Sequence, residues 1–287
     1  MNNSYFSRLE GLFDQKALDR VIICVGVGGA RSFLENLARN GFKSFILIDG
    51  DTVSETNIAT QAVRISEIGM PKAEAAKNAV LDISPDARVI CINRFLDDSM
   101  TDKELLALME SFEGRESTDF LLCGCTDNFA AQRRTAELAV KYRIPYLAAM
   151  MYEQGAAAEV IFTYPDVTKS CPRCMLESRY RLYENGFENH TGSAGCSVFA
   201  TERMNALKGY IALMLLCYGT ESAFGGCLDD VKDRNFVWIR LDSKLESKLG
   251  IKLFDSVLPK EYAYADETLW LPQTPEKNCP LCGGRGA

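Results

Sequence analysis

The stretch VIICVGVGGARSFLENLARNG, residues 21–41, joins an apolar run to a glycine-rich turn and then to an amphipathic segment. The continuous apolar run at 21–25 is typical of a buried parallel strand. After the turn, apolar residues recur at helical spacing over 33–38,. The stretch therefore predicts a strand, a tight turn and a helix, the unit that opens a doubly wound α/β sheet.

Strand and helix patterns alternate through the next hundred residues, which favours a Rossmann-like, mostly parallel sheet with its ligand at the carboxyl ends of the strands. A later apolar run predicts a strand that continues the sheet in antiparallel pairing. We expect further strands at 44–49, 87–92, 119–124, 156–165 and 236–241, and helices at about 71–82, 102–111, 128–142 and 197–218. A polar stretch at 184–195 is expected to form a long loop,.

Composition limits the partners. The chain has 287 residues and a net charge of -7, which argues against a nucleic-acid partner because phosphate binding relies on clustered Lys and Arg. The most apolar run, 211–218, is too short to cross a bilayer,. The first residues lack a signal-peptide pattern, so we expect a cytoplasmic protein without a membrane partner.

The glycine turn indicates a nucleotide site. Backbone N–H groups of Gly26, Gly28 and Gly29 and the positive end of the following helix can face a phosphate. Asp49 closes the next strand, where a carboxylate can accept hydrogen bonds from ribose hydroxyls. The alternative is a turn that only makes a tight strand-to-helix connection. Arg31 occupies the place of the third glycine of an NAD fingerprint, where it could contact phosphate or face solvent.

The segment after Asp49 extends the site beyond the needs of a dinucleotide. Asp51, Asn57, Gln61 and Lys72 are groups suited to holding a triphosphate and its magnesium,. Carboxylates hold metal, amides contact phosphate oxygens, and the lysine supplies a point charge. The segment therefore favours ATP over NAD as the ligand.

Two polar residues follow the fourth expected strand at the same edge of the sheet. A carboxylate at Asp127, next to Asn128, can hold magnesium against the phosphates,. The alternative is that Asp127 only caps the following helix.

Two CxxC motifs lie far apart in sequence and indicate one metal site. Four thiolates from two such motifs form a closed, structural zinc site; the alternative is two separate redox pairs. The four residues are Cys171, Cys174, Cys279 and Cys282. Among the other cysteines, Cys196 ends the expected loop and is a packed residue or a reactive one, and the only histidine, His190, is expected at the surface.

Taken in order, GVGG (26–29), IDGDTVSETN (48–57), GMPKAEA (69–75), CTDN (125–128) and the paired CxxC motifs resemble the ThiF/MoeB/HesA group of the ubiquitin-activating enzyme superfamily over residues 20–282. The resemblance implies ATP, Mg²⁺ and a homodimer that adenylates the C-terminal carboxylate of a small ubiquitin-like or sulfur-carrier protein or a peptide. It divides one domain into a nucleotide-binding half, 1–165, and a half with the zinc clasp, crossover loop and partner surface, 166–287.

The resemblance also assigns roles. Asp49 would hold the ribose, and Asn57, Gln61 and Lys72 would contact phosphates. Asp127 would take the magnesium-linked position. Arg8 resembles the arginine that family members lend to the neighbouring subunit.

Two positions depart from the family pattern. Thr60 stands where the family usually has an arginine, a charge that Arg64 or Arg8 could replace. Thr191 stands at the family's thiol position, which argues against an enzyme thioester there, and leaves Cys196 as the cysteine for any later thioester. The leading hypothesis is an adenylyltransferase. Its alternatives are a degenerate nucleotide-binding subunit or scaffold and, less favoured, an NAD-dependent oxidoreductase.

Overall fold

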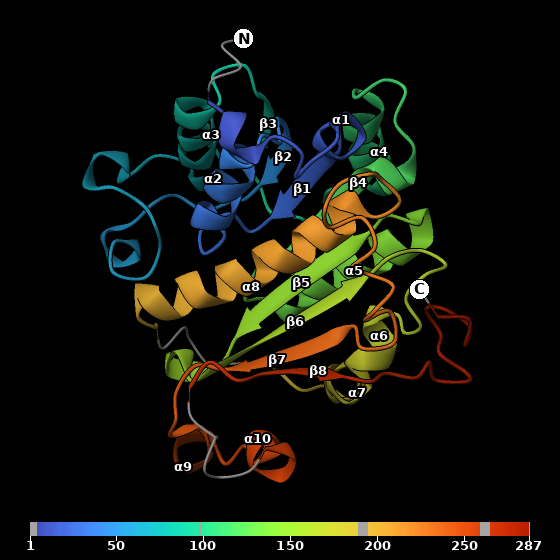
Figure 1. Ribbon diagram of the computed structural model, residues 1–287. Coiled ribbons are helices and arrows are strands. Elements are labelled where there is room, and N and C mark those ends of the chain that lie inside the picture. Colours follow the sequence, from blue (N-terminus) through green and yellow to red (C-terminus); the bar gives the residue numbers. More distant parts are fainter. Residues whose placement is uncertain (1–4, 98, 189–194, 259–264, 287) are drawn as a thin grey trace.

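A single eight-stranded sheet runs through the molecule in the order β3-β2-β1-β4-β5-β6-β7-β8 (Figure 1). The computed structural model describes residues 5–97, 99–188, 195–258 and 265–286. The strands are β1 (Val21–Val25), β2 (Ser44–Ile48), β3 (Arg88–Ile92), β4 (Phe120–Gly124), β5 (Tyr146–Met151), β6 (Ala157–Thr163), β7 (Phe236–Arg240) and β8 (Thr268–Leu271).

The first five strands are parallel, and the last three continue the sheet in antiparallel pairing. Val25, the last residue of β1, is level with Ile48 at the end of β2 and with Gly124 at the end of β4. The chain order reverses between β1 and β4, and such a reversal is where doubly wound sheets bind ligands. The predicted fold class is confirmed.

Helices cover both faces of the sheet, and α8 crosses one face while α5 lies behind the sheet (Figure 1). One apolar core joins that face to α2, α3 and α8, and a second joins the other face to α4, α5 and α7. The α-helices are α1 (Gln15–Leu18), α2 (Arg31–Arg39), α3 (Lys72–Ile83), α4 (Asp102–Glu110), α5 (Phe129–Tyr142), α6 (Pro172–Met175), α7 (Glu177–Glu184), α8 (Val198–Cys217), α9 (Leu245–Leu249) and α10 (Leu253–Val257). The 3-10 helices are η1 (Ser7–Leu9), η2 (Glu55–Asn57), η3 (Ile65–Glu67), η4 (Ser117–Asp119) and η5 (Glu153–Gly155).

Two strands form where the sequence predicted none. β5 has the sequence YLAAMM, which lacks the β-branched residues of a typical strand, yet it is held between β4 and β6,. β8 lies in a segment expected to be irregular and pairs with β7. In both cases the neighbouring strand supplies the hydrogen bonds that local propensity does not predict.

Half of the predicted loop at 184–195, residues 189–194, lies outside the described residues, and this half includes His190 and Thr191. Within the described part of the chain, no helix combines the length and apolarity that a bilayer span requires.

Candidate nucleotide site and cysteine cluster

The glycine turn after β1 touches the loop after β4. Gly26 has a φ of +81°, and a Cβ atom there would lie 2.8 Å from the backbone nitrogen of Thr126. That contact is with backbone, which cannot rotate away, so only glycine fits. The Gly26 N–H donates to the carbonyl of Ile48 at 2.9 Å, which ties the turn to β2 as well.

A second glycine makes room for a side chain. A Cβ atom on Gly28 would lie 2.7 Å from Oε1 of Gln61, whereas one on Gly29 would have nothing within 4 Å. The Gln61 Oε1 atom is buried, and none of the described residues donates a hydrogen bond to it. The turn therefore meets the 54–61 loop at Gly28 and is open at Gly29.

Asp49 is a fixed acceptor beside the turn. It is 7% exposed, and its Oδ2 accepts from the Val27 N–H at 2.8 Å while Oδ1 accepts from the Asp51 N–H at 2.9 Å. Burial raises the pKa of Asp49, and the two backbone N–H groups oppose that rise,. These bonds set the carboxylate at the end of β2, and its remaining lone pairs can accept from a hydroxyl.

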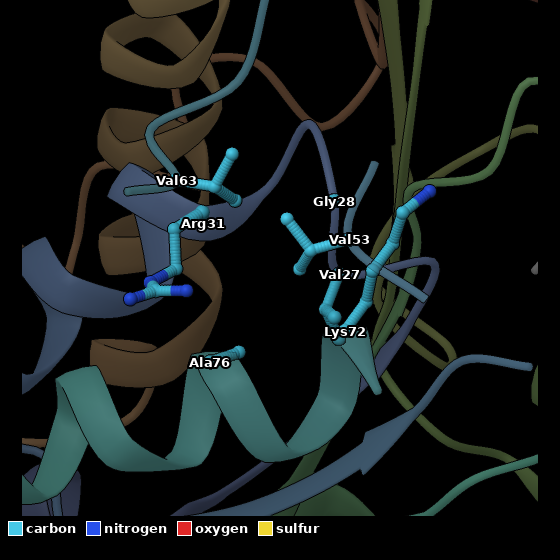
Figure 2. Close-up of a pocket in the computed structure, with 7 residues that line it drawn as sticks. All are labelled: Val27, Gly28, Arg31, Val53, Val63, Lys72 and Ala76. Carbon is cyan, nitrogen blue, oxygen red and sulfur yellow. The ribbon is translucent and has the colours of Figure 1, made fainter. Parts of the chain in front are cut away.

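Lys72 begins α3 and faces the same edge. Its Nζ lies 2.9 Å from Oδ2 of Asp51, and its N–H donates to the Asp51 carbonyl at 2.9 Å. Figure 2 shows Lys72 and Arg31 lining one pocket with Gly28, Val53 and Val63, and pointing away from each other. A phosphate at this pocket would compete with Asp51 for the ammonium group.

Asn57 stabilises its own loop. Its Oδ1 accepts from the Ser54 N–H at 2.9 Å in the capping box of η2, which leaves its NH₂ group as the available donor.

Asp127 and Asn128 have different roles. Asn128 Oδ1 accepts from the N–H groups of Ala130 and Ala131 at 2.8 and 3.2 Å, so Asn128 is the N-cap of α5,. The alternative that Asp127 caps this helix is wrong. Asp127 is exposed at the carboxyl end of β4, next to the backbone that touches Gly26.

Arg8 is not brought to the site within one chain. It is exposed in η1, and neighbouring Phe6 packs near Gly41, ahead of β2, whereas Asp49 follows β2. A five-residue strand separates these two ends by about 15 Å. Arg8 therefore lies near the opposite end of β2 from Asp49.

Arg31 does not face solvent, so that expectation for it is wrong, and its guanidinium is paired with two carboxylates beside the pocket that it lines. It is 2% exposed, and its guanidinium donates to Glu35 at 2.9 Å and to Glu67 at 2.8 Å. Glu67 in turn accepts from the Arg64 N–H at 2.7 Å. The residue at the third-glycine position thus ties α2 to η3.

Thr60, which stands at the place of the family arginine, and Arg64, which could replace its charge, contact different helices. The carbonyl of Thr60 accepts from the Thr201 hydroxyl at 3.3 Å. The Arg64 guanidinium is mostly exposed and lies 3.9 Å from Asp82 on α3. The cations that line the pocket are Lys72 and Arg31.

Lys208, within the helix expected at 197–218, is buried in α8 beneath the site. It is 1% exposed, and its Nζ lies 3.6 Å from Sγ of Cys125 and 4.6 Å from the centre of the Phe33 ring. The Cys24 thiol and the Lys208 ammonium lower the pKa of Cys125 to about 6. A lysine in the middle of an apolar helix was the only sequence signal for this contact.

The four cysteines of the CxxC motifs form one buried group, with sulfur atoms all within 4.8 Å of one another. Sulfur pairs 171–174, 171–279 and 174–282 are 3.6, 3.7 and 3.7 Å apart. Tetrahedral zinc with Zn–S bonds of about 2.3 Å needs sulfurs about 3.8 Å apart. The Glu276 N–H donates to Cys174 Sγ at 3.3 Å, a hydrogen bond that would orient a thiolate ligand,. The residues fit zinc, and the arrangement favours one site over two redox pairs.

Cys196 packs at the start of α8. A Cβ atom on Gly155 would lie 2.8 Å from Cβ of Cys196, and the Cys196 Sγ lies 3.3 Å from the Thr201 hydroxyl. It is partly buried against the core, close to the Thr60 loop.

The ThiF family model matches residues 3–219, and the chain belongs to the ThiF family. It is 31% identical over 169 residues, 56% of this chain, to a molybdopterin-synthase adenylyltransferase of Escherichia coli. That match spans 61% of the relative's length. A tRNA threonylcarbamoyladenosine dehydratase of Bacillus subtilis is 35% identical over 96 residues, 31% of this chain and 38% of that protein.

The fold is also similar to solved structures. The crystal structure of E. coli MccB with AMPCPP and MccA superposes with a TM-score of 0.65, covering 98% of this chain and 75% of that one at 18% identity. This likeness extends the shared architecture beyond the matched family region, into the C-terminal half.

Zinc binding predicts a measurable metal content. We expect about one equivalent of zinc per chain by elemental analysis, and a lower thermal midpoint after chelation, because metal affinity contributes to folding. Cys227→Ser, at a cysteine outside the group, should keep the zinc, whereas Cys279→Ser should lose it. A fully folded metal-free protein, or a disulfide within either motif, would contradict the assignment.

The buried pair of Arg31 and Glu67 predicts a large stability effect. Arg31→Ala should lower the free energy of unfolding by about 3–5 kcal/mol, because it leaves a buried carboxylate unpaired. Urea denaturation measures the loss. Arg39→Ala is the control, since Arg39 is 57% exposed and 3.7 Å from Glu35; it should cost under about 1 kcal/mol. Equal effects of the two variants would refute the role given to Arg31.

Proposed function

We propose that this protein is an ATP-dependent adenylyltransferase that activates the C-terminal carboxylate of a small ubiquitin-like or sulfur-carrier protein, or of a peptide. One observation carries the proposal: the glycine turn, the buried Asp49, Lys72 and the exposed Asp127 converge on the switch point of the sheet. Membership of the ThiF family and the similarity to a protein named as an adenylyltransferase support it.

The reaction forms an acyl adenylate. An oxygen of the substrate carboxylate attacks the α-phosphorus of ATP, and the bond to pyrophosphate breaks in line. Because no protein nucleophile takes part, the chain contributes position and charge neutralisation. No cysteine is needed for this step, and Cys196 is the candidate for any later thioester.

The residues divide these tasks. Backbone N–H groups at Gly28 and Gly29 and the start of α2 face the phosphates, whereas the Gly26 N–H, expected from the sequence to do so, is bound to the Ile48 carbonyl. Asp49 accepts from the ribose. The Lys72 ammonium leaves the Asp51 carboxylate and pairs with the departing pyrophosphate.

The amides complete the phosphate contacts. Asn57 and Gln61 donate their NH₂ groups to phosphate oxygens, and Asn128 fixes the start of α5 beside Asp127,.

Magnesium suits the carboxylates at this edge. Asp127 and Asp51 are exposed there, and carboxylate oxygens are ligands that Mg²⁺ prefers. When bound, Mg²⁺ offsets phosphate charge. Zn²⁺ in the cysteine group is structural and holds the C-terminal segment to the residues that follow β6, within the partner-binding half at 166–287. The nucleotide-binding half is 1–165.

We further propose a homodimer that works in the cytoplasm. The exposed Arg8, at the far edge of the sheet from its own site, supports donation to a second copy. The cysteines of the CxxC motifs form no disulfide, and unpaired thiols persist in a reducing compartment, which supports a cytoplasmic location.

A nucleotide-binding subunit without catalysis is the second candidate. It is favoured by Thr60, which supplies no cation, and by Arg31, whose guanidinium is occupied by two carboxylates. A tRNA substrate, suggested by the name of one relative, is disfavoured by the net charge of -7,.

Asp127→Ala tests the proposal. It should reduce ATP–pyrophosphate exchange by about 100-fold or more, the scale for loss of a main electrostatic group. Exchange with a synthetic glycine-ended carrier is the assay, and Asp230→Ala, an exposed carboxylate remote from the site, is the control. Near-normal exchange by Asp127→Ala would exclude the catalytic role, and no exchange by the wild type with protein or peptide carriers would favour the non-catalytic subunit.

A further inference from the structure

Three polar residues lie on one side of the apolar helix α8, at positions i, i+4 and i+7. Thr201, Asn205 and Lys208 are 5, 3 and 1% exposed. Residues at this spacing share a helix face, which here is turned to the carboxyl edge of the sheet. We call these three residues the α8 stripe.

Each member of the α8 stripe touches a different loop of the candidate nucleotide site. The Thr201 hydroxyl donates to the carbonyl of Thr60, in the loop that carries Gln61, at 3.3 Å. The Asn205 NH₂ group donates to the carbonyl of Gly29 in the glycine turn at 2.9 Å. One helix thus holds two of the three loops by hydrogen bonds to backbone.

Lys208 holds the third loop. Its ammonium lies 3.6 Å from the sulfur of Cys125, two residues before Asp127 in the loop that touches Gly26. It also lies over the Phe33 ring at 4.6 Å, on the helix that follows the glycine turn. Lys208 therefore contacts both sides of the switch point.

Burying the polar groups of the α8 stripe costs folding free energy. The Asn205 Oδ1 atom is buried without a donor among the described residues, and Lys208 faces a thiol and a ring, where a buried charge gains most from a carboxylate. An apolar residue in place of Lys208 would satisfy the surrounding core better. The Asn205 NH₂ group, by contrast, is paired with the Gly29 carbonyl and the Ser32 hydroxyl, at 2.9 Å each. The cost indicates that these side chains serve the loops and not the stability of the helix.

We propose that the α8 stripe positions the nucleotide site: Asn205 sets the glycine turn for ATP binding, and Lys208 sets the loop of Asp127 for the chemical step. Neither residue touches the reacting atoms, so both are positioning residues. The kinetic test of this inference rests on the proposed adenylation. A second, independent test requires only that the protein bind Mg-ATP.

Two near-isosteric variants separate the roles. Lys208→Met should lower kcat for ATP–pyrophosphate exchange by about tenfold or more, because small misplacements of a catalytic group are expensive, with the KM for ATP within about threefold of wild type. Asn205→Leu should raise the KM for ATP by about tenfold and the Kd for Mg-ATP, measured by calorimetry, in parallel. Lys208→Met should keep or raise the thermal midpoint, whereas Asn205→Leu, which leaves the Gly29 carbonyl without this donor, should lower it,.

Ile211→Val is the matched control, because Ile211 is a fully buried apolar residue of α8 outside the stripe. It should lower the thermal midpoint and leave kcat and KM unchanged. If the changes in kcat and KM across the three variants were proportional to the losses in thermal midpoint, the proposal would be overturned. Unchanged kcat and KM in both Lys208→Met and Asn205→Leu would overturn it as well.

If the wild type shows no exchange, the proposed function fails, and calorimetry still decides the inference. A Kd for Mg-ATP that rises about tenfold in Asn205→Leu and stays constant in Ile211→Val would uphold the role of Asn205. Equal affinity in all variants would refute the inference.

Discussion

The contact between two loops at Gly26 is the constraint on which the site depends. The end of β1 and the end of β4 lie in register, and the loops that follow approach until only a glycine fits beside the backbone of Cys125 and Thr126. A side chain at Gly26 would separate the phosphate-facing turn from Asp127. Because parallel strands place their carboxyl ends at one edge, this single contact makes one site from segments a hundred residues apart.

The surroundings of that contact are held from two sides. On one side, the buried pair of Arg31 and Glu67 joins α2 to η3, which stabilises the 53–70 segment carrying Gln61. On the other, α8 crosses the sheet and reaches all three loops with polar side chains. The cysteine group fixes a different region, where residues after β6 meet residues after β8, and leaves the nucleotide edge unconstrained.

Much of this was predictable from sequence where the signal is local or strongly patterned. The apolar run and glycines of β1 and its turn identify the parallel sheet, and Asp49 is placed by the end of β2. The paired CxxC motifs identify the cysteine group, although the motifs are about a hundred residues apart. Long-range pairings were not predictable. The partner of Arg31 lies 36 residues away, and Lys208 meets Cys125 across 83 residues, so neither periodicity nor spacing indicates them. β5 was missed because its neighbours, and not its own residues, make it a strand.

The central claim is that the edge at β1 and β4 is a site for a triphosphate and not for a dinucleotide. Isothermal calorimetry with Mg-ATP and with NAD on the zinc-loaded protein tests it most directly. The account predicts saturable binding of Mg-ATP, weakened when Lys72→Ala removes the ammonium that faces Asp51, and little or no heat from NAD. Tight NAD binding without a response to Mg-ATP would contradict it.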